Sequence, residues 1–292
     1  MNETTLPPQA TKQSRIRYDL AQFLVEQASP SFGQECVLTG SVSRGVADDY
    51  SDIEMVFYVD RLPLSQDREE WLQHIDATKV VRHKETSDSV WVTFSTHRVW
   101  VETGWQTFAT QEKALDELLT GTVTDHGELT LAWVIAHAVP LRSTRHLARW
   151  KQKLTRYPES LPAHIIADSG RFWTLEHVFE ERWVLLQRGD AMSLAERLLG
   201  DVQFLLRILF AVNHQWEPEW KWLQAEVEHL TIKPERLAER INAIFASPQN
   251  EETIAQYLLL LRDVLRLASL YLDVGSWLRN VEESLRKHRF MG

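Results

Sequence analysis

The character of the chain changes near Thr144, and this change limits the folds that the sequence can adopt. Before it, short runs of β-forming residues alternate with helical patterns, separated by turn residues. After it, strand patterns nearly vanish, and apolar residues recur at helical spacing to the end of the chain. The sequence therefore predicts an α+β fold, with a mixed β-sheet and helices in a domain at 1–145 and an all-helical domain at 146–292.

Local patterns place the elements of both domains. In the first domain, helices are expected at 16–27, 65–75 and 111–119, and strands at 35–39, 52–59, 79–82, 90–95, 98–106 and 139–143. In the second domain, helices are expected at 146–156, 163–188, 191–214, 218–230, 234–246 and 252–288. Proline and glycine mark the boundaries between most of these helices.

Composition and charge exclude several classes of protein. A hydrophobic content of 44% excludes a disordered chain. The net charge of −9 disfavours nucleic acid as a partner, because binding to a phosphate backbone needs a surplus of Lys and Arg. The longest apolar run is far too short to cross a membrane, and the N-terminus lacks the apolar core of a secretory signal. The single cysteine, Cys36, predicts a reducing, cytoplasmic location.

One stretch, residues 38–54, carries most of the chemical information. Gly40 and Ser41 follow a short strand, so their backbone N–H groups and the Ser41 hydroxyl can approach an anion closely. Arg44 lies one turn further on and can pair with a phosphate oxygen. This turn is therefore expected to bind the phosphates of a nucleotide.

Two acids at the start of the next strand add a second function to this stretch. Asp52 and Glu54 are two residues apart, so both point to one face of a strand. Carboxylates this close repel each other unless a cation lies between them, and Mg²⁺ shared with substrate phosphates suits such oxygen ligands. Glu102, on a strand of alternating pattern, is the expected third ligand if that strand is adjacent, while Glu85 and Asp88 are alternatives.

This combination resembles the nucleotidyltransferase superfamily of the DNA polymerase β type, and most closely the kanamycin and aminoglycoside nucleotidyltransferases. The similarity is carried by Gly40-Ser41 with Arg44, by Asp52-x-Glu54 within the run Tyr50–Met55, and by Glu102 as the isolated acid between β residues. It is specific over residues 38–54 and loose over the rest of the first 145 residues. In the second domain it concerns architecture alone.

The resemblance implies a reaction and a set of residues. Two Mg²⁺ ions would be held by Asp52, Glu54 and Glu102 together with the triphosphate of ATP or another NTP. A nucleoside monophosphate, AMP in the first instance, would pass to a hydroxyl of a small molecule such as an aminoglycoside-like or lincosamide-like antibiotic. A glutamate on the second domain would act as general base, with Glu180 the first choice and Glu176 and Glu181 the alternatives. Lys221 would reach the triphosphate.

Other interpretations stay open at the level of sequence. The same chemistry could act on a protein or RNA acceptor, or the chain could be a catalytically silent nucleotide-binding protein. If these residues have no binding role, Gly40-Ser41 is an ordinary turn, and Asp52 and Glu54 are the solvated start of a strand. The basic helix at 146–156 could face RNA, although a solvated helix face is the default. The identity of the acceptor and of the NTP, and a homodimeric state, are not fixed by the sequence.

Overall fold

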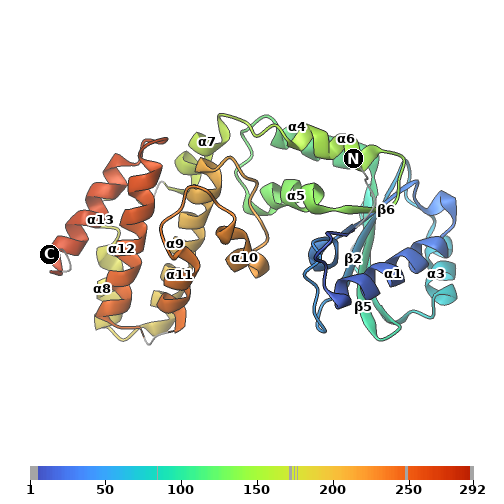
Figure 1. Cartoon of the computed structure of the whole chain (residues 1–292), viewed down its shortest axis with the longest axis horizontal. Helices are drawn as coiled ribbons and strands as arrows, with labels where there is room; N and C mark the ends of the chain where they lie inside the picture. The colour runs from blue at the N-terminus through green and yellow to red at the C-terminus, as the bar shows by residue number, and fades with distance from the viewer. Residues whose placement is uncertain are drawn as a thin grey trace. The chain divides into compact units, whose positions relative to one another are not determined.

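The computed structural model describes residues 6–83, 85–170, 173, 175, 177–246 and 249–289 (Figure 1). The chain forms two compact units, the first made of residues 1–120 and 131–156 and the second of 121–130 and 157–292. It therefore enters the second unit, returns to the first and ends in the second. The predicted α+β class, with a mixed sheet followed by a helical C-terminal part, is confirmed.

Within the described residues, six strands form one mixed sheet in the order β3-β4-β5-β2-β1-β6. Strands β2 and β5 are parallel, and the other neighbouring pairs are antiparallel. The strands correspond to the expected ones, with small shifts at their ends. Their bounds are β1 Glu35–Thr39, β2 Ile53–Val59, β3 Thr78–Arg82, β4 Ser89–Thr96, β5 Val99–Thr107 and β6 Val139–Arg142.

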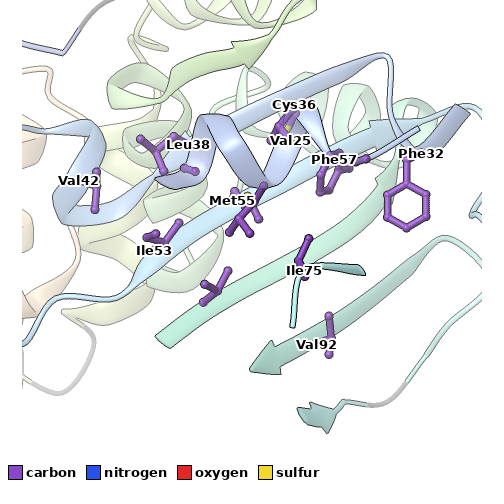
Figure 2. Close-up of a cluster of buried hydrophobic side chains, with 14 of the residues drawn as sticks. Val25, Phe32, Cys36, Leu38, Val42, Ile53, Met55, Phe57, Ile75 and Val92 are labelled. Atoms are coloured by element: carbon purple, nitrogen blue, oxygen red, sulfur yellow. The ribbon is translucent and has the colours of Figure 1, made fainter. Parts of the chain in front are cut away.

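One face of the sheet is the main core of the first unit (Figure 2). Helix α1 (Lys12–Glu26), the short helix η1 (Pro30–Phe32) and helix α3 (Ser65–His74) contribute buried residues to it. On β2, Ile53, Met55 and Phe57 belong to this core, and the ring of Phe57 stacks on Trp105 of β5 at 5.6 Å. Since strand residues alternate between faces, the residues between them on β2 face the other side of the sheet.

That other side carries helices α4 (Phe108–Leu118) and α6 (His146–Leu154). Tyr58 of β2 packs edge-on against Trp150 at 4.6 Å and stacks with Phe108 at 6.2 Å. Helix α2 (Gly40–Ser43) directly follows β1, and helix α5 (His126–His137) directly precedes β6. Helix α5 was not among the expected elements, because its sequence is apolar along most of its length and shows little helical periodicity.

The units divide the chain differently from the expected boundary after residue 145, because α6 belongs to the first unit. The buried carboxylate of Glu35, on β1, accepts hydrogen bonds from the backbone N–H groups of Thr144 at 2.5 Å, His146 at 3.3 Å and Leu147 at 3.1 Å. These bonds fix the start of α6 against the sheet. The assignment of separate functions to 1–145 and 146–292 stays a prediction.

The second unit is helical, and α9 and α12 supply much of its buried surface. Among the described residues, no helix is both long enough and apolar enough to cross a membrane. The bounds are α7 Leu161–Ser169, α8 Glu180–Gln187, α9 Ala191–Val212, η3 Trp220–Trp222, α10 Leu223–Glu228, α11 Leu237–Ala246, α12 Glu251–Ala268 and α13 Gly275–Lys287.

Two long helices expected from the sequence are each divided in two. The segment 163–188 is divided between α7 and α8, and α7 ends just before Gly170. Only glycine fits at this position, because a Cβ atom at Gly170 would lie 2.1 Å from the ring of Trp277. The segment 252–288 contains α12 and α13, with a turn at 269–274. Apolar residues continue through this second break, including Leu270 and Tyr271, so the sequence pattern conceals it.

Candidate functional site

The turn after β1 places a glycine against a carboxylate. Gly40 begins α2 with φ at +66°, in the left-handed region that favours glycine. A Cβ atom at this position would lie 2.5 Å from Oε1 and 2.6 Å from Cδ of Glu54. The carboxylate of Glu54 therefore lies directly against the Cα atom of Gly40, and the backbone angle favours glycine there.

The strand register brings a second acid beside Glu54. Thr39 of β1 pairs with Glu54, and Glu54 pairs in parallel register with Glu102 of β5. Neighbouring residues in register point to the same face of a sheet, so Glu54 and Glu102 share the face opposite the core. Asp52 immediately precedes β2, two residues before Glu54. Asp52 and Glu54 are half-buried and Glu102 is exposed.

The predicted three-acid metal set is only partly gathered in this structure. Across the ranges that the structure describes, no group of three or more His, Cys, Asp or Glu side chains is close enough together to hold a metal ion. What the fold does bring together is the pair Glu54 and Glu102, with the backbone of Gly40 beside Glu54. The role of the acids as ligands stays a prediction.

Helix α1 fixes the loop that leads into Asp52. The side chain of Arg17 is buried and donates to the carbonyl oxygen of Ser51 at 2.6 Å and of Asp49 at 3.1 Å. Near the start of the same helix, the hydroxyl of Ser14 accepts a hydrogen bond from the backbone N–H of Ala47 at 2.9 Å. Sequence reasoning missed Arg17, because nothing local links an arginine to a loop more than thirty residues away.

A tight turn at Asp48 completes this loop. Its carboxylate accepts hydrogen bonds from the Ser51 hydroxyl and the Tyr50 backbone N–H, both at 2.9 Å. These hydrogen bonds, the Ser51 one foremost, hold the pKa of Asp48 below its ordinary value. Tyr50 at the tip is 96% exposed, so its ring is open to a ligand immediately before the acids.

Arg44 and the serines of α2 lie close to the turn. The guanidinium carbon of Arg44 lies 4.7 Å from the ring centroid of Trp133 on α5, a cation–π contact that orients the side chain. Ser41 is buried, and Ser43 donates from its hydroxyl to the carbonyl oxygen of Gly40 at 3.0 Å. Trp133 is a second residue that sequence reasoning missed, since α5 was not expected.

The two remaining site candidates belong to the second unit and are both in ion pairs. Glu180 is the first residue of α8, and its Oε2 accepts from Lys287 at 2.7 Å and from His288 at 3.1 Å. Burial alone would raise the pKa of Glu180, but the hydrogen bonds from Lys287 and His288 outweigh it and hold that pKa below its ordinary value. Lys221 lies on η3 and pairs with Glu219 at 3.1 Å. Glu176 lies outside the described residues.

A cavity of about 880 Å³ lies within the second unit, between the segment leading into α8 and helix α9. Trp173 and Phe204 form its apolar part, with their rings 4.6 Å apart, and Glu181 and Glu196 supply acidic groups. Gly200, in the middle of α9, also lines it, and a Cβ atom there would meet nothing within 4 Å.

A buried ion pair stiffens one wall of this cavity. Arg182 donates from Nε to Asp201 at 2.9 Å and from Nη2 to both carboxylate oxygens at 2.7 Å. Trp173 adds a hydrogen bond to the same carboxylate at 3.2 Å. Because Asp201 and Arg182 are both nearly inaccessible, the pair fixes α8 against α9. We refer to this space as the α8–α9 cavity.

Comparisons with known proteins give limited information on function. A protein family described as a domain of unknown function (DUF4037) matches residues 125–223, a part of the chain that excludes the acids of the first unit. A nucleotidyltransferase-like protein from Exiguobacterium sibiricum 255-15 is similar in structure with a TM-score of 0.38 and 13% sequence identity, over 94% of this chain and 79% of that one. No curated protein sequence matches the chain. The residues of the site therefore carry the functional argument.

Replacing Gly40 by alanine should destabilise the first unit by more than the backbone angle alone requires. A left-handed conformation costs a non-glycine residue about 1–2 kcal/mol. At Gly40 the new Cβ would also push the Glu54 carboxylate, the end of a flexible side chain, out of its position, which adds about 0.5–1.5 kcal/mol. Gly189→Ala is the reference, because Gly189 has a φ of +70° and open space around it. The free energy of unfolding in urea measures both losses.

A double-mutant cycle isolates the contact with Glu54. In a Glu54→Ala background, Gly40→Ala should lose only the amount seen at Gly189, because the carboxylate is gone. An equal loss in both backgrounds would mean that Glu54 does not lie against Gly40.

Proposed function

We propose that this protein is a nucleotidyltransferase that moves a nucleoside monophosphate, AMP from ATP, to a hydroxyl group of a small molecule. The observation that carries the proposal is the close approach of the Glu54 carboxylate to Gly40, with Glu102 directly beside Glu54 on the neighbouring parallel strand. A carboxylate pair beside the backbone N–H groups of a turn is a donor set that suits a divalent cation shared with a phosphate group. The similarity of the run Tyr50–Met55 to the aminoglycoside nucleotidyltransferases supports the same conclusion.

The acids fit magnesium by their chemistry and their arrangement. Carboxylate oxygens are the ligands that Mg²⁺ prefers, and Mg²⁺ commonly binds one or two carboxylates while phosphates and water complete its shell. Asp52, Glu54 and Glu102 would hold two such ions jointly with the triphosphate. When bound, the two ions would neutralise the negative charge that develops on the attacking and leaving oxygens. The neighbouring positions of Glu54 and Glu102 support this assignment.

The residues of the turn would bind and orient the triphosphate. The Gly40-Ser41 turn would offer backbone N–H groups to a phosphate oxygen, and the Ser41 hydroxyl can donate to it. Arg44 is oriented by the ring of Trp133 and offers a planar set of donors that matches phosphate geometry. To bind the triphosphate, the ammonium group of Lys221 would have to leave its ion pair with Glu219 and take a phosphate oxygen as its partner.

We further propose that the acceptor binds in the α8–α9 cavity. Its volume of about 880 Å³ suits a small molecule. The acids that line it, Glu181, Glu196 and Asp201, outnumber the arginines, Arg182 and Arg197, which favours a ligand that carries amino groups. An aminoglycoside-like compound meets both requirements.

Among the helix glutamates considered for the general base, Glu180 is held by Lys287 and His288. Glu181 also has ion pairs, with Arg182 and Arg197 at 3.4 Å each, but it lines the α8–α9 cavity. We therefore favour Glu181 over Glu180 as the residue that faces the acceptor.

A pyrophosphate-release assay tests the proposal directly. The full chain is incubated with Mg²⁺ and either ATP or GTP in the presence of kanamycin, lincomycin or unmodified tRNA. We expect Mg²⁺-dependent pyrophosphate release with ATP and kanamycin, and a product that carries one AMP by mass spectrometry. Labelled tRNA, or AMP attached to the protein fraction, would favour a nucleic acid or protein acceptor instead. Nucleotide binding without release of pyrophosphate from any mixture would favour a catalytically silent protein.

Glu180→Gln should lower the stability of the second unit at neutral pH and have little effect in acid. The folded state holds the pKa of Glu180 below its ordinary value of 4.5, so its ion pairs stabilise the fold above that pH. This stabilisation disappears as the pH falls through the folded pKa. Thermal unfolding from pH 7 to pH 3 should therefore show a difference from the unchanged chain that shrinks with acidification.

The matched control is Glu196→Gln, an acid of the cavity for which the structure shows no ion pair among the described residues. It should shift stability by a similar small amount at every pH. Turnover separates a structural role of Glu180 from a catalytic one. If Glu180→Gln lowers turnover by about 10²–10⁴-fold, the range for loss of a general base, Glu180 is the general base after all.

A further inference from the structure

A groove on the first unit is separate in its residues from the acid site. It has a volume of about 580 Å³ and lies along α6 and the end of β6. Its walls carry three cations, Arg145, Arg149 and Lys151. Its floor includes the apolar groups of Pro140, Leu147 and Ala148. We call this feature the basic groove.

The basic groove is positively charged, whereas the whole chain has a negative net charge. The chain carries a net charge of −9, yet no acidic residue lines the groove and none occurs between residues 145 and 156. Arg145 and Arg149 are exposed, and Arg149 is bonded through Nη2 to the ring of His146, at 2.7 Å. The carboxylate of Glu112 on α4 also attracts Arg149, but Glu112 is paired with Lys153 at 2.8 Å, so the exposed guanidinium keeps part of its charge available for an anion.

Lys153 and the backbone donors at the start of α6 interact with acids that do not line the groove. Lys153 pairs with Glu112 at 2.8 Å and Asp116 at 2.9 Å, both on α4. The N-terminal backbone donors of α6 are taken by the buried carboxylate of Glu35. The attraction for an anion therefore comes from the side chains of the groove and not from the helix terminus.

We propose that the basic groove binds a small organic anion that carries a phosphate or sulfate group on an apolar body. Guanidinium and ammonium groups bind such oxygens with charge-assisted hydrogen bonds, and the floor offers apolar contact to the rest of the ligand. The volume falls within the range of small-molecule sites. None of the residues that line it is aromatic, and binding of single-stranded nucleic acid depends largely on aromatic stacking. A small ligand therefore fits the groove better than an RNA strand.

Calorimetry on the full chain tests this with three probes: 1-naphthyl phosphate, inorganic phosphate and 1-naphthol. We expect 1-naphthyl phosphate to bind more tightly than inorganic phosphate, and 1-naphthol not to bind measurably. Arg149→Gln should weaken 1-naphthyl phosphate by about tenfold, the effect of losing a charge-assisted hydrogen bond. Arg156→Gln is the matched control, because Arg156 is exposed near the same helix but does not line the groove. It should change the affinity by less than about twofold, since exposed charges beyond the groove are screened by salt.

Several outcomes would overturn this inference. Equal losses in Arg149→Gln and Arg156→Gln would mean non-specific attraction, and no binding of 1-naphthyl phosphate would exclude the ligand class. Tighter binding of an oligouridine strand that competes with 1-naphthyl phosphate would identify an RNA surface instead. Loss of binding in Asp52→Asn would place the probe at the acid site. Because no arm of this test measures pyrophosphate release, its failure and the failure of the transferase proposal are distinguishable.

Discussion

Asp52→Asn and Glu54→Gln are expected to lower nucleotide transfer by at least about 10³-fold, which corresponds to about 4 kcal/mol of transition-state stabilisation. Either change removes a negative oxygen ligand from the set that would hold Mg²⁺ with the triphosphate. The fold should tolerate both changes, because Glu54 lies on the face of β2 opposite the core residues Ile53 and Met55, and Asp52 precedes the strand and is half-buried. Removal of one acid from a group of neighbouring carboxylates also relieves repulsion, so the unfolding temperature should hold or rise slightly.

Asp60→Asn provides the matched control for these variants. Asp60 directly follows the other end of β2 and is exposed, so the substitution removes the same charge at a distance from the Glu54–Glu102 pair. It should keep the turnover of the unchanged chain. The measurement is pyrophosphate release at saturating ATP and Mg²⁺, with circular dichroism to verify the fold. Turnover near that of Asp60→Asn in both Asp52→Asn and Glu54→Gln would show that the acids do not form the reacting site.

The sequence predicted the parts of this site that depend on local pattern. The strand at Ile53–Val59 follows from a run rich in β-forming residues and the strand at Val99–Thr107 from alternation, and the structure pairs them in parallel with Glu54 beside Glu102. The turn at Gly40 was expected because a glycine after a short strand is typical of a tight turn. These results rest on local composition and spacing, which a single sequence displays directly.

The parts that could not be predicted depend on contacts between distant segments. Arg44 packs on Trp133, and the carboxylate of Glu180 meets Lys287 at the far end of the chain. No spacing rule connects such residues, since tertiary packing determines which side chains meet. The division of the segment 163–188 was hidden for a similar reason, because Gly170 is required by the ring of Trp277 packed against it. As a result, Glu180 is the first residue of α8, whereas the sequence pattern predicted it in the interior of a helix at 163–188.

Gly200→Leu should weaken the binding of an aminoglycoside probe by up to roughly 100-fold while making the protein more stable. Gly200 lies inside the 22-residue helix α9, where glycine costs about 0.5–1 kcal/mol relative to alanine. A Cβ atom there would meet nothing within 4 Å, so packing does not explain the glycine. Gly200 lines the α8–α9 cavity, so under our proposal a long side chain at this position would project into the space of the acceptor. Overlap with a bound ligand costs about 1–3 kcal/mol.

The comparison of Gly200→Ala with Gly200→Leu separates helix stability from blockage of the cavity. Both variants should raise the free energy of unfolding, by up to about 1 kcal/mol, because both remove the entropic cost of glycine. Kanamycin affinity, measured by calorimetry on the full chain, should stay close to its original value in the alanine variant and fall in the leucine variant. If Gly200→Leu is more stable and still binds kanamycin as before, the acceptor does not use this cavity. Transfer to kanamycin by that variant would keep the transferase proposal while moving the acceptor elsewhere.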